Sequence, residues 1–354
     1  MDPESSDRRV SVRDMAKVLG VSHSAVSLAL RNSTQVSEKL RKNVRQLADR
    51  LGYQPDPMLA ALSNYRREKS AHPVQSVIAW IDAWEKPAKL RSFKEYEAYW
   101  TGAGQAARKL GYQLEEIRMT GEITPQQLNE ALSARGIRAL LLPPHANVPD
   151  WGDFPWENYF VVRFGRSLPA PLTHLVTADQ TENAAMAFEK ILERGYRRIG
   201  FITREAPMRA SCHLSEAGYL IAQRAVTEEL RLPVCSLAGT KGAAVAKRLA
   251  SWVKKHRPDA ILTDIPSLPG LLEKIGLRVP DDIAVATTTV LDSGIGAGIN
   301  PQPEEIGRVG VLLLGSMMQE GALGLPPIFR QILVEGSWGD GASLPDRKAA
   351  PIAV

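Results

Sequence analysis

The sequence predicts an all-helical N-terminal head joined to an α/β body of two lobes, each built on a doubly wound parallel sheet. Three observations predict this fold. Residues 11–51 carry the caps and apolar spacing of three short helices, strand and helix patterns alternate from Val74 onward, and the net positive charge lies within the first 70 residues. A chain of 354 residues is long enough for two or three domains at about 150 residues each.

Composition excludes several classes of protein. With 44% hydrophobic and 23% charged residues, the chain is neither disordered nor collagen-like. Its two cysteines, Cys212 and Cys235, do not make a disulfide framework, and its start, MDPESSDRRV, lacks the apolar core of a signal peptide. Apolar stretches such as 139–142 fall far short of the roughly 18 residues that a membrane span needs. We therefore expect a cytoplasmic protein without membrane contact.

The placement of charge separates the head from the body. Residues 1–70 carry 13 Lys and Arg against 8 Asp and Glu, whereas the rest of the chain holds 31 of each sign. A basic module on a neutral body is the asymmetry expected when one small domain binds a polyanion. Charge alone is equally consistent with a solvated helical surface.

The first two helices of the head have clear start and stop signals. Ser11 is a suitable N-cap, Asp14 follows three residues later, and Gly20 ends the first helix. The apolar face of this helix comprises Val12, Met15, Ala16 and Leu19. Ser22 follows the turn and can cap a second helix. The inward positions of that helix are Ala25, Val26, Ala29 and Leu30. Two helices joined by a tight turn that contains glycine form a helix-turn-helix motif.

A third helix is expected from the cap Ser37 to Leu51. The second helix can enter the major groove of DNA, where side chains near its N-terminus reach base edges. The expected base-reading residues are His23, Ser24 and Leu28. Residues positioned for contacts with the DNA backbone are Arg13, Ser22, Ser27, Arg31 and Tyr53. Each could be an ordinary exposed residue, but together they favour DNA binding.

The body shows two rounds of strands and helices. The first round predicts strands at 77–81, 112–117, 139–142 and 160–164, with helices at 96–110 and 125–134. The second predicts strands at 175–178, 199–203, 260–263 and 283–287, with helices at 183–194, 216–230, 242–255 and 268–275. Nearly continuous apolar strands alternating with helices indicate parallel sheets covered on both faces. Two similar halves make a two-lobed domain.

The cleft between such lobes is the expected ligand site, because ligands bind beyond the carboxyl ends of parallel strands. Candidate residues follow the predicted strand ends. They are Asp82, Trp84, His145, Arg166, Ser215, Asp264, Thr289 and Asp292. An ordinary loop role is the alternative for each.

The head resembles the lactose-repressor (LacI/GalR) family of bacterial transcription regulators. The resemblance rests on Val10-Ser-Val-Arg-Asp-Met-Ala-Lys-Val-Leu-Gly-Val-Ser22, then Ala-Val-Ser at 25–27, Val36-Ser37 and Leu51-Gly-Tyr-Gln-Pro55. Most members carry Arg at the position of Leu28, where it pairs with guanine. Because Leu28 could instead touch a thymine methyl group, the family's usual half-site sequence is not carried over.

The linker after the head carries a second family feature. Asp56 can cap a short helix with Pro57 at its first position. The resemblance implies that this hinge helix forms when two copies pair over DNA, and that Leu62 wedges into the minor groove. The alternative is that Leu62 packs in a core or dimer contact.

The resemblance extends into the body through Gly-Tyr-Arg-Arg-Ile-Gly at 195–200 and Gly-Leu-Arg-Val-Pro-Asp-Asp-Ile-Ala at 276–284. It implies a periplasmic-binding-protein-like effector domain whose chain crosses between lobes three times, near Leu172, Ile299 and Leu325. The expected domains are a head at 1–54, a hinge helix and linker at 55–73, a two-lobed body at 74–345 and a tail at 346–354. Lobe 1 is expected at about 74–172 and 299–324, and lobe 2 at about 173–298 and 325–345.

Two departures from the family concern the effector. The family's usual acid after Val-x-Gly-Tyr/Phe is absent, and Thr289 stands there; the common Arg shortly before residues 217–219 is replaced by Ser215. Sugar ligands are therefore not carried over. Since Arg166 and His145 could add positive charge, we expect either an acidic or phosphorylated small molecule or a cleft that responds to no free sugar.

No catalytic pattern is supported. Gly102, Gly104 and Ala107 fit a dinucleotide fingerprint superficially, but they fall inside a predicted helix. Walker A, H-E-x-x-H and G-x-S-x-G sequences are absent, and the six histidines lack metal spacing. Cys212 and His213 would pair only by spatial accident. We expect no catalytic residues, cofactor or metal.

The sequence therefore favours a homodimeric transcription regulator, most often a repressor in the resembled family. It would bind a near-palindromic operator and an effector of unknown identity. A solute-binding receptor could use the same two-lobed body, but the head and the missing signal peptide argue against it. A sugar-processing enzyme would need catalytic residues.

Overall fold

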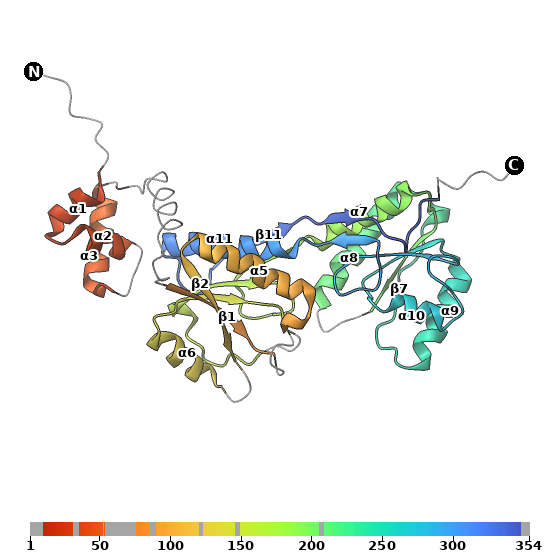
Figure 1. Ribbon diagram of the computed structural model, residues 1–354, viewed down its shortest axis with the longest axis horizontal. Coiled ribbons are helices and arrows are strands. Elements are labelled where there is room, and N and C mark those ends of the chain that lie inside the picture. The colour runs from red at the N-terminus through yellow and green to blue at the C-terminus, as the bar shows by residue number, and fades with distance from the viewer. Residues whose placement is uncertain are drawn as a thin grey trace, which may run out of the picture.

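The computed structural model describes residues 10–30, 35–51, 53, 76–84, 90–119, 123–145, 149–204 and 209–347 (Figure 1). They form a helical head and two α/β lobes, as the sequence predicted. No helix among these residues is both long and apolar enough to cross a membrane.

The head contains α1 (Val12–Leu19), α2 (His23–Leu30) and α3 (Glu38–Leu51). The predicted caps are confirmed. Ser11 and Asp14 form a capping box, and Gly20 ends α1 at a φ of 64°. Ser22 Oγ accepts a hydrogen bond from the Ala25 amide (3.1 Å), and Ser37 Oγ accepts one from the Leu40 amide (3.3 Å). These bonds satisfy amides that a helix start otherwise leaves without partners.

One small apolar cluster holds the three helices of the head together. Its fully buried members are Met15, Val26, Ala29 and Val44. They lie on the faces that helical spacing predicted, because residues three and four apart share one side of a helix. Leu30 is half-buried and packs against this cluster, as expected, and Ala25 is half-buried.

The first lobe is built on a six-stranded sheet in the order β11-β5-β4-β3-β1-β2. Its strands are β1 (Ser76–Asp82), β2 (Tyr112–Arg118), β3 (Ala139–Leu142), β4 (Phe160–Phe164), β5 (His174–Ala178) and β11 (Gln331–Val334). All neighbouring strands pair in parallel. Strands buried on both faces explain the continuous apolar runs in the sequence.

Helices cover both faces of this sheet. On one face, α5 (Lys94–Lys109) and α11 (Pro303–Glu320) lie side by side (Figure 1) and pack on a core that includes Trp80 and Phe164. On the other face, α6 (Pro125–Ala134) and the aromatic segment 151–159 pack on Ile81 and Leu142. Short 3-10 turns lie at Leu90–Ser92 and Trp156–Asn158.

The second lobe has a six-stranded sheet in the order β12-β10-β9-β8-β6-β7. Its strands are β6 (Ile199–Thr203), β7 (Cys235–Ser236), β8 (Ala260–Thr263), β9 (Ala284–Thr287), β10 (Gly298–Asn300) and β12 (Ser337–Gly339). Only β12 runs antiparallel among these described strands. The helices are α7 (Gln180–Glu193), α8 (Arg209–Ala222), α9 (Ala243–His256) and α10 (Leu268–Glu273).

The helix expected at 216–230 is wrong beyond Ala222. The chain there forms two 3-10 turns, Gln223–Ala225 and Glu228–Leu230, in place of a continuous helix. Buried Gln223 accounts for part of this change, because its side-chain carbonyl accepts a hydrogen bond from the Leu232 amide (2.8 Å) and draws the following loop back.

Two of the three expected crossings lie elsewhere. Strand β5 belongs to the first sheet and leads into α7, so the chain crosses after Ala178 and not near Leu172. Strand β11 also belongs to the first sheet, so the last crossing follows Val334 and not Leu325. The middle crossing, between β10 and α11, agrees with the expectation near Ile299. Strand pairing explains both differences: β5 pairs in parallel with β4, and β11 pairs in parallel with β5, so both strands belong to the first sheet.

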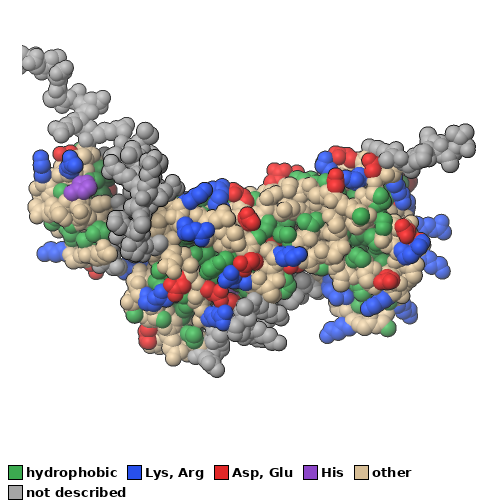
Figure 2. Space-filling model, in the orientation of Figure 1, with side chains coloured by type: hydrophobic (Ala, Val, Ile, Leu, Met, Phe, Trp, Pro, Cys, Tyr) green, Lys and Arg blue, Asp and Glu red, His purple; other side chains and the backbone are tan. Residues whose placement is uncertain are grey.

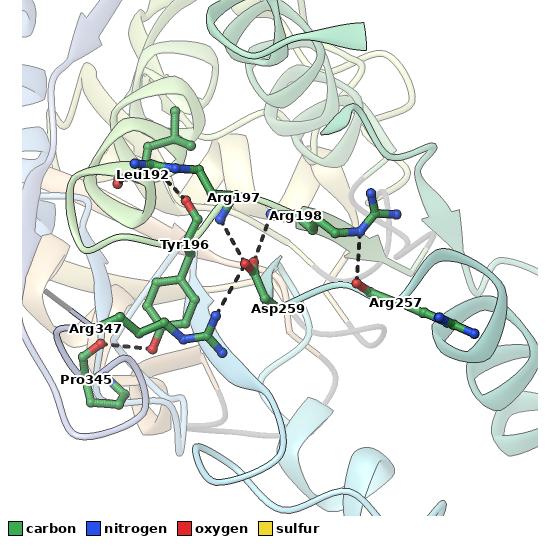
Figure 3. A network of polar contacts seen from close by, with 8 residues as sticks. All are labelled: Leu192, Tyr196, Arg197, Arg198, Arg257, Asp259, Pro345 and Arg347. Atoms are coloured by element: carbon green, nitrogen blue, oxygen red, sulfur yellow. Dashed lines mark hydrogen bonds and ion pairs between the residues drawn. The ribbon is translucent and has the colours of Figure 1, made fainter. Parts of the chain in front are cut away.

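A polar network fixes the end of the described chain to the second lobe (Figure 3). The Asp259 carboxylate accepts hydrogen bonds from the Arg197 and Arg198 amides, both 2.9 Å long, and lies 3.4 Å from Arg347 Nη1. The Arg347 guanidinium lies over the Tyr196 ring, whose hydroxyl donates to the Pro345 carbonyl (2.9 Å). These contacts connect the start of β6, the start of β8 and the C-terminal segment, so they are structural.

Candidate functional site

The exposed side of α2 carries the predicted base-reading residues. His23 and Ser24 are exposed near its N-terminus, and Leu28 is half-buried one turn later. The opposite side of α2 is held in the head core by Val26 and Ala29. The helix therefore presents a short polar end that a major groove can admit.

The residues predicted to contact the DNA backbone differ in exposure. Arg13 and Ser22 are exposed, whereas Ser27 is half-buried and Tyr53 packs against the head core. Exposed Lys39, Lys42 and Arg45 on α3 add positive charge, and Figure 2 shows Lys and Arg side chains on the visible side of the head. Arg31 and Leu62 lie outside the described residues.

The carboxyl edges of the two sheets in the body face each other. Strand β5 ends where the chain passes into the second lobe, and β10 ends where it passes back into the first. Since β1, β3 and β4 run parallel to β5, and β6, β8 and β9 run parallel to β10, the carboxyl ends of these strands face the other lobe. Loops at these ends are where parallel sheets bind ligands.

Three predicted residues meet at the edge of the first lobe. Asp82 ends β1, and its carboxylate accepts a hydrogen bond from the Trp84 amide (2.9 Å). The Trp84 indole donates to the Pro144 carbonyl (2.9 Å), and the Ala83 amide donates to His145 Nε2 (3.1 Å). The loops after β1 and β3 are therefore tied together. Burial raises the pKa of Asp82 above its ordinary value.

His145 does not supply the positive charge that the sequence suggested. It is 2% exposed, and burial lowers its pKa to about 4. The imidazole is neutral near pH 7, with Nε2 as a hydrogen-bond acceptor. Its role at this edge is to hold the loops in place.

The positive charge comes from two arginines. Arg166 lies after β4 as predicted, and its Nη2 donates to Gln331 Oε1 (2.8 Å). Arg163 lies within β4 and is 6% exposed, so reasoning from strand ends missed it. An arginine inside an otherwise apolar strand was the available signal.

The second lobe holds the remaining predicted residues in separate places. Asp264 follows β8 and accepts hydrogen bonds from Thr203 Oγ1 (2.5 Å) and the Arg204 amide (3.3 Å). Thr289 follows β9, and its amide donates to Thr287 Oγ1 (3.3 Å). Ser215 is buried on α8. Asp264 and Thr289 lie at the edge that faces the first lobe.

Asp292 links the two lobes directly. Its carboxylate oxygens accept hydrogen bonds from the Lys94 amide (2.9 Å) and the Glu95 amide (3.2 Å), at the start of α5 in the first lobe. A carboxylate at a helix N-terminus is favoured by the free amides and the helix dipole. The sequence predicted Asp292 as a ligand contact, and the structure places it in a contact between lobes.

Glu95 is a neighbour of this contact that the sequence did not indicate. Burial raises its pKa to about 7, and the negative charge of Asp292 adds to the rise; a 3.3 Å hydrogen bond from the Tyr99 hydroxyl opposes it. We therefore expect the contact between the lobes to respond to pH near neutrality.

The described residues contain no cluster of three or more His, Cys, Asp or Glu that could hold a metal ion. Burial raises the pKa of Cys235 to about 11, which keeps this thiol protonated and unreactive. Gly102 and Gly104 lie inside α5, so they do not form a dinucleotide-binding turn.

Comparison with known proteins identifies both parts of the chain. Residues 11–56 match the family described as bacterial regulatory proteins, lacI family, and residues 188–337 match the periplasmic binding protein-like domain. The transcriptional regulator CelR of Thermobifida fusca is 26% identical over 288 residues, which cover 78% of this chain and 81% of CelR. The repressor CytR of Escherichia coli K12 is 24% identical over 342 residues, 90% and 93% of the two chains.

Solved structures show the same fold. A CelR–cellobiose complex aligns with a TM-score of 0.54 and 22% identity, over 95% of this chain and all of that one. The lac repressor dimer bound to operator aligns with a TM-score of 0.51 and 15% identity, over 96% of this chain and all of that one. These likenesses show that the chain shares the fold of both structures.

Proposed function

Because the chain belongs to the lacI family of bacterial regulatory proteins, we propose that it represses transcription by binding an operator through its head and an effector between its lobes. It is a sequence-specific DNA-binding regulator. The observation that carries the proposal is the capped α2, whose N-terminal residues are exposed while its other side is fixed in the head core.

The head determines which DNA is bound. We assign His23, Ser24 and Leu28 to base edges, and Arg13, Ser22, Ser27, Arg31 and Tyr53 to the DNA backbone. The exposure of His23 and Ser24 supports the first group, and the exposure of Arg13 and Ser22 supports the second. Leu28 favours a thymine methyl group over guanine, because an aliphatic side chain offers no hydrogen bond.

Two copies act together. One head reads only a short half-site, so a homodimer on a near-palindromic operator supplies the needed specificity. Leu62, in the linker outside the described residues, is assigned to the minor groove between the half-sites, with packing in a core or dimer contact as the alternative.

The body senses a small molecule. Strand ends of both lobes carry polar side chains toward each other, which is the arrangement that binds ligands in parallel sheets. The solved CelR structure is a complex with cellobiose. In this chain Thr289 and Ser215 replace the family's acid and arginine, which argues against carrying over a sugar. A receptor without DNA binding would not need the head. We place the protein in the cytoplasm, where its DNA is, and assign it no enzymatic activity.

Selection of duplexes from a random pool by the purified full-length chain tests this function. We expect a dyad-symmetric motif, because two identical heads read identical half-sites. Leu28→Arg should change the preferred base at one position of each half-site toward guanine, and Arg13→Ala should weaken binding to all sequences alike. A pool that converges on no motif, or a Leu28→Arg variant with unchanged preference, would contradict the assignment.

A further inference from the structure

Strand β4 contains a buried cation for which the fold offers little compensation. Arg163 is 6% exposed, and its register neighbours on the adjacent strands are Leu142 and Leu175. Its Nη1 donates to the Leu168 carbonyl. Its Nε is buried without a hydrogen-bond partner among the described residues. A guanidinium removed from water in this way is costly unless it is neutralised.

A second arginine lies close enough to add to this cost. Arg166 follows three residues later; its Nη2 donates to Gln331, and its Nε is also buried without a described partner. The positive charge of Arg166 opposes the charge of Arg163, whereas Asp179 is the acid whose charge favours that of Arg166. No described carboxylate forms an ion pair with either arginine. The pair therefore keeps an excess of positive charge.

The two arginines are held in position by the surrounding loops. The bond from Arg163 to the Leu168 carbonyl and the bond from the His145 amide to Ser167 Oγ (2.9 Å) fix the segment after β4 against the loop after β3. Both loops are at the carboxyl edge of the first sheet, the edge that faces the second lobe. An apolar residue would fill the strand position of Arg163 at lower cost, so the charge points to a use in binding.

We propose that Arg163 and Arg166 form the anion-binding part of the effector site and take a carboxylate or phosphate group of a small molecule. This inference rests on the proposed function, since it names the chemistry of the effector. Guanidinium groups present planar pairs of donors that match carboxylate and phosphate oxygens, and hydrogen bonds to charged groups are the stronger kind.

Titration of the full-length protein with inorganic phosphate, with acetate and with chloride at matched ionic strength tests the proposal. We expect saturable binding of phosphate or acetate, detected by calorimetry and as a rise in thermal midpoint, and no such response to chloride. The stronger of the two responses identifies the oxyanion class. Arg163→Met should weaken that binding by about ten-fold or more, which corresponds to losing one charged hydrogen bond.

Three variants distinguish an anion-binding role of Arg163 from a structural role. If Arg163 serves the ligand, Arg163→Met keeps or raises the midpoint in chloride, because an apolar side chain suits the buried position. Arg163→Lys, which keeps the charge but not the paired donors, should bind with intermediate strength. Arg278→Gln, on the exposed surface of the second lobe beside Asp281 and Asp282, is the matched control and should bind as the wild type does.

Wild-type protein that binds neither oxyanion, or an Arg163→Met variant that responds as the wild type does, would overturn the proposal. If Arg163→Met does not fold, oxyanion binding by Arg163→Lys and Arg166→Gln tests the proposal in its place. Unchanged oxyanion binding by both variants overturns the proposal. Operator binding measured without oxyanions is a separate readout. If the wild type does not bind operator, the proposed function is contradicted. If it binds operator normally but binds no oxyanion, only this inference is contradicted.

Discussion

Replacing Gly307 with alanine should destabilise the first lobe by about 1–3 kcal/mol or more. A Cβ atom at this position would lie 2.0 Å from the Tyr99 carbonyl oxygen and 2.8 Å from its carbon. The same close approach occurs in reverse, since a Cβ at Gly102 would lie 1.8 Å from the Glu304 carbonyl oxygen. These neighbours are backbone atoms of packed helices, so α5 and α11 would have to move apart.

Urea unfolding of the Gly307→Ala variant measures this effect, and Gly104→Ala is its matched control on α5. The nearest atoms to a Cβ at Gly104 belong to side chains at 3.6 and 3.9 Å, which is ordinary contact. Because alanine favours a helix over glycine by about 1 kcal/mol, this control should be neutral or stabilising. Equal stability of the two variants would show that the helices do not pack this closely.

Replacing Asp292 with alanine should loosen the association of the two lobes. The two hydrogen bonds from Asp292 to the start of α5 connect the lobes. A carboxylate at an exposed helix start contributes about 1 kcal/mol, so the ratio of associated to separated lobes should fall roughly five-fold. Small-angle X-ray scattering should then report a larger radius of gyration. Asp281→Ala, which removes an acid paired with Arg278 inside the second lobe, should leave the radius unchanged.

The same contact should respond to pH. Burial raises the pKa of Glu95 to about 7, and the Asp292 carboxylate of the second lobe adds to the rise, so the protonated form of Glu95 favours association of the lobes. This contribution is lost as pH rises through 7, where the Glu95 and Asp292 carboxylates repel each other. We expect the radius of gyration to increase between about pH 6 and 8, and Glu95→Gln to remove the increase. A pH-independent radius in the wild type would contradict this.

Local signals in the sequence predicted correctly those helices and strands whose ends are marked by caps or whose residues form apolar runs. The capping box at Ser11, the αL Gly20 and the cap Ser22 define the head, and four strands, including Phe160–Phe164, have the predicted bounds. These features depend on neighbours within a few residues, which the sequence displays directly.

Helix α11 was not predicted, although Pro303 at its start and Gly321 just past its end are signals of a helix. Gly307, Gly310 and Gly315 interrupt its apolar pattern and lower its intrinsic helix propensity. Their purpose is visible only in three dimensions, because Gly307 meets the backbone of α5 and Gly310 meets the Phe164 ring. The crossings were misplaced for a similar reason: only pairing between strands distant in sequence assigns β5 and β11 to the first sheet.

The positions of the site residues could be predicted from the sequence, but their charges and hydrogen-bond partners could not. Residues after strand ends lie at the facing edges, as parallel topology requires. Their charges and partners depend on burial and on the other lobe, so His145 is neutral and Asp292 binds the start of α5. Sequence reasoning missed Arg163 because it selected residues that follow strand ends, whereas Arg163 lies within a strand.

Affinity for the selected operator and for a scrambled duplex of equal length, measured across a range of salt concentrations, decides whether the head recognises a DNA sequence. We expect about 10³-fold or tighter binding to the operator at each salt concentration, the margin typical of specific recognition. Both affinities should fall with salt, with a log–log slope of about −0.9 for each phosphate neutralised. Equal affinity for the two duplexes, or binding that salt does not weaken, would contradict it.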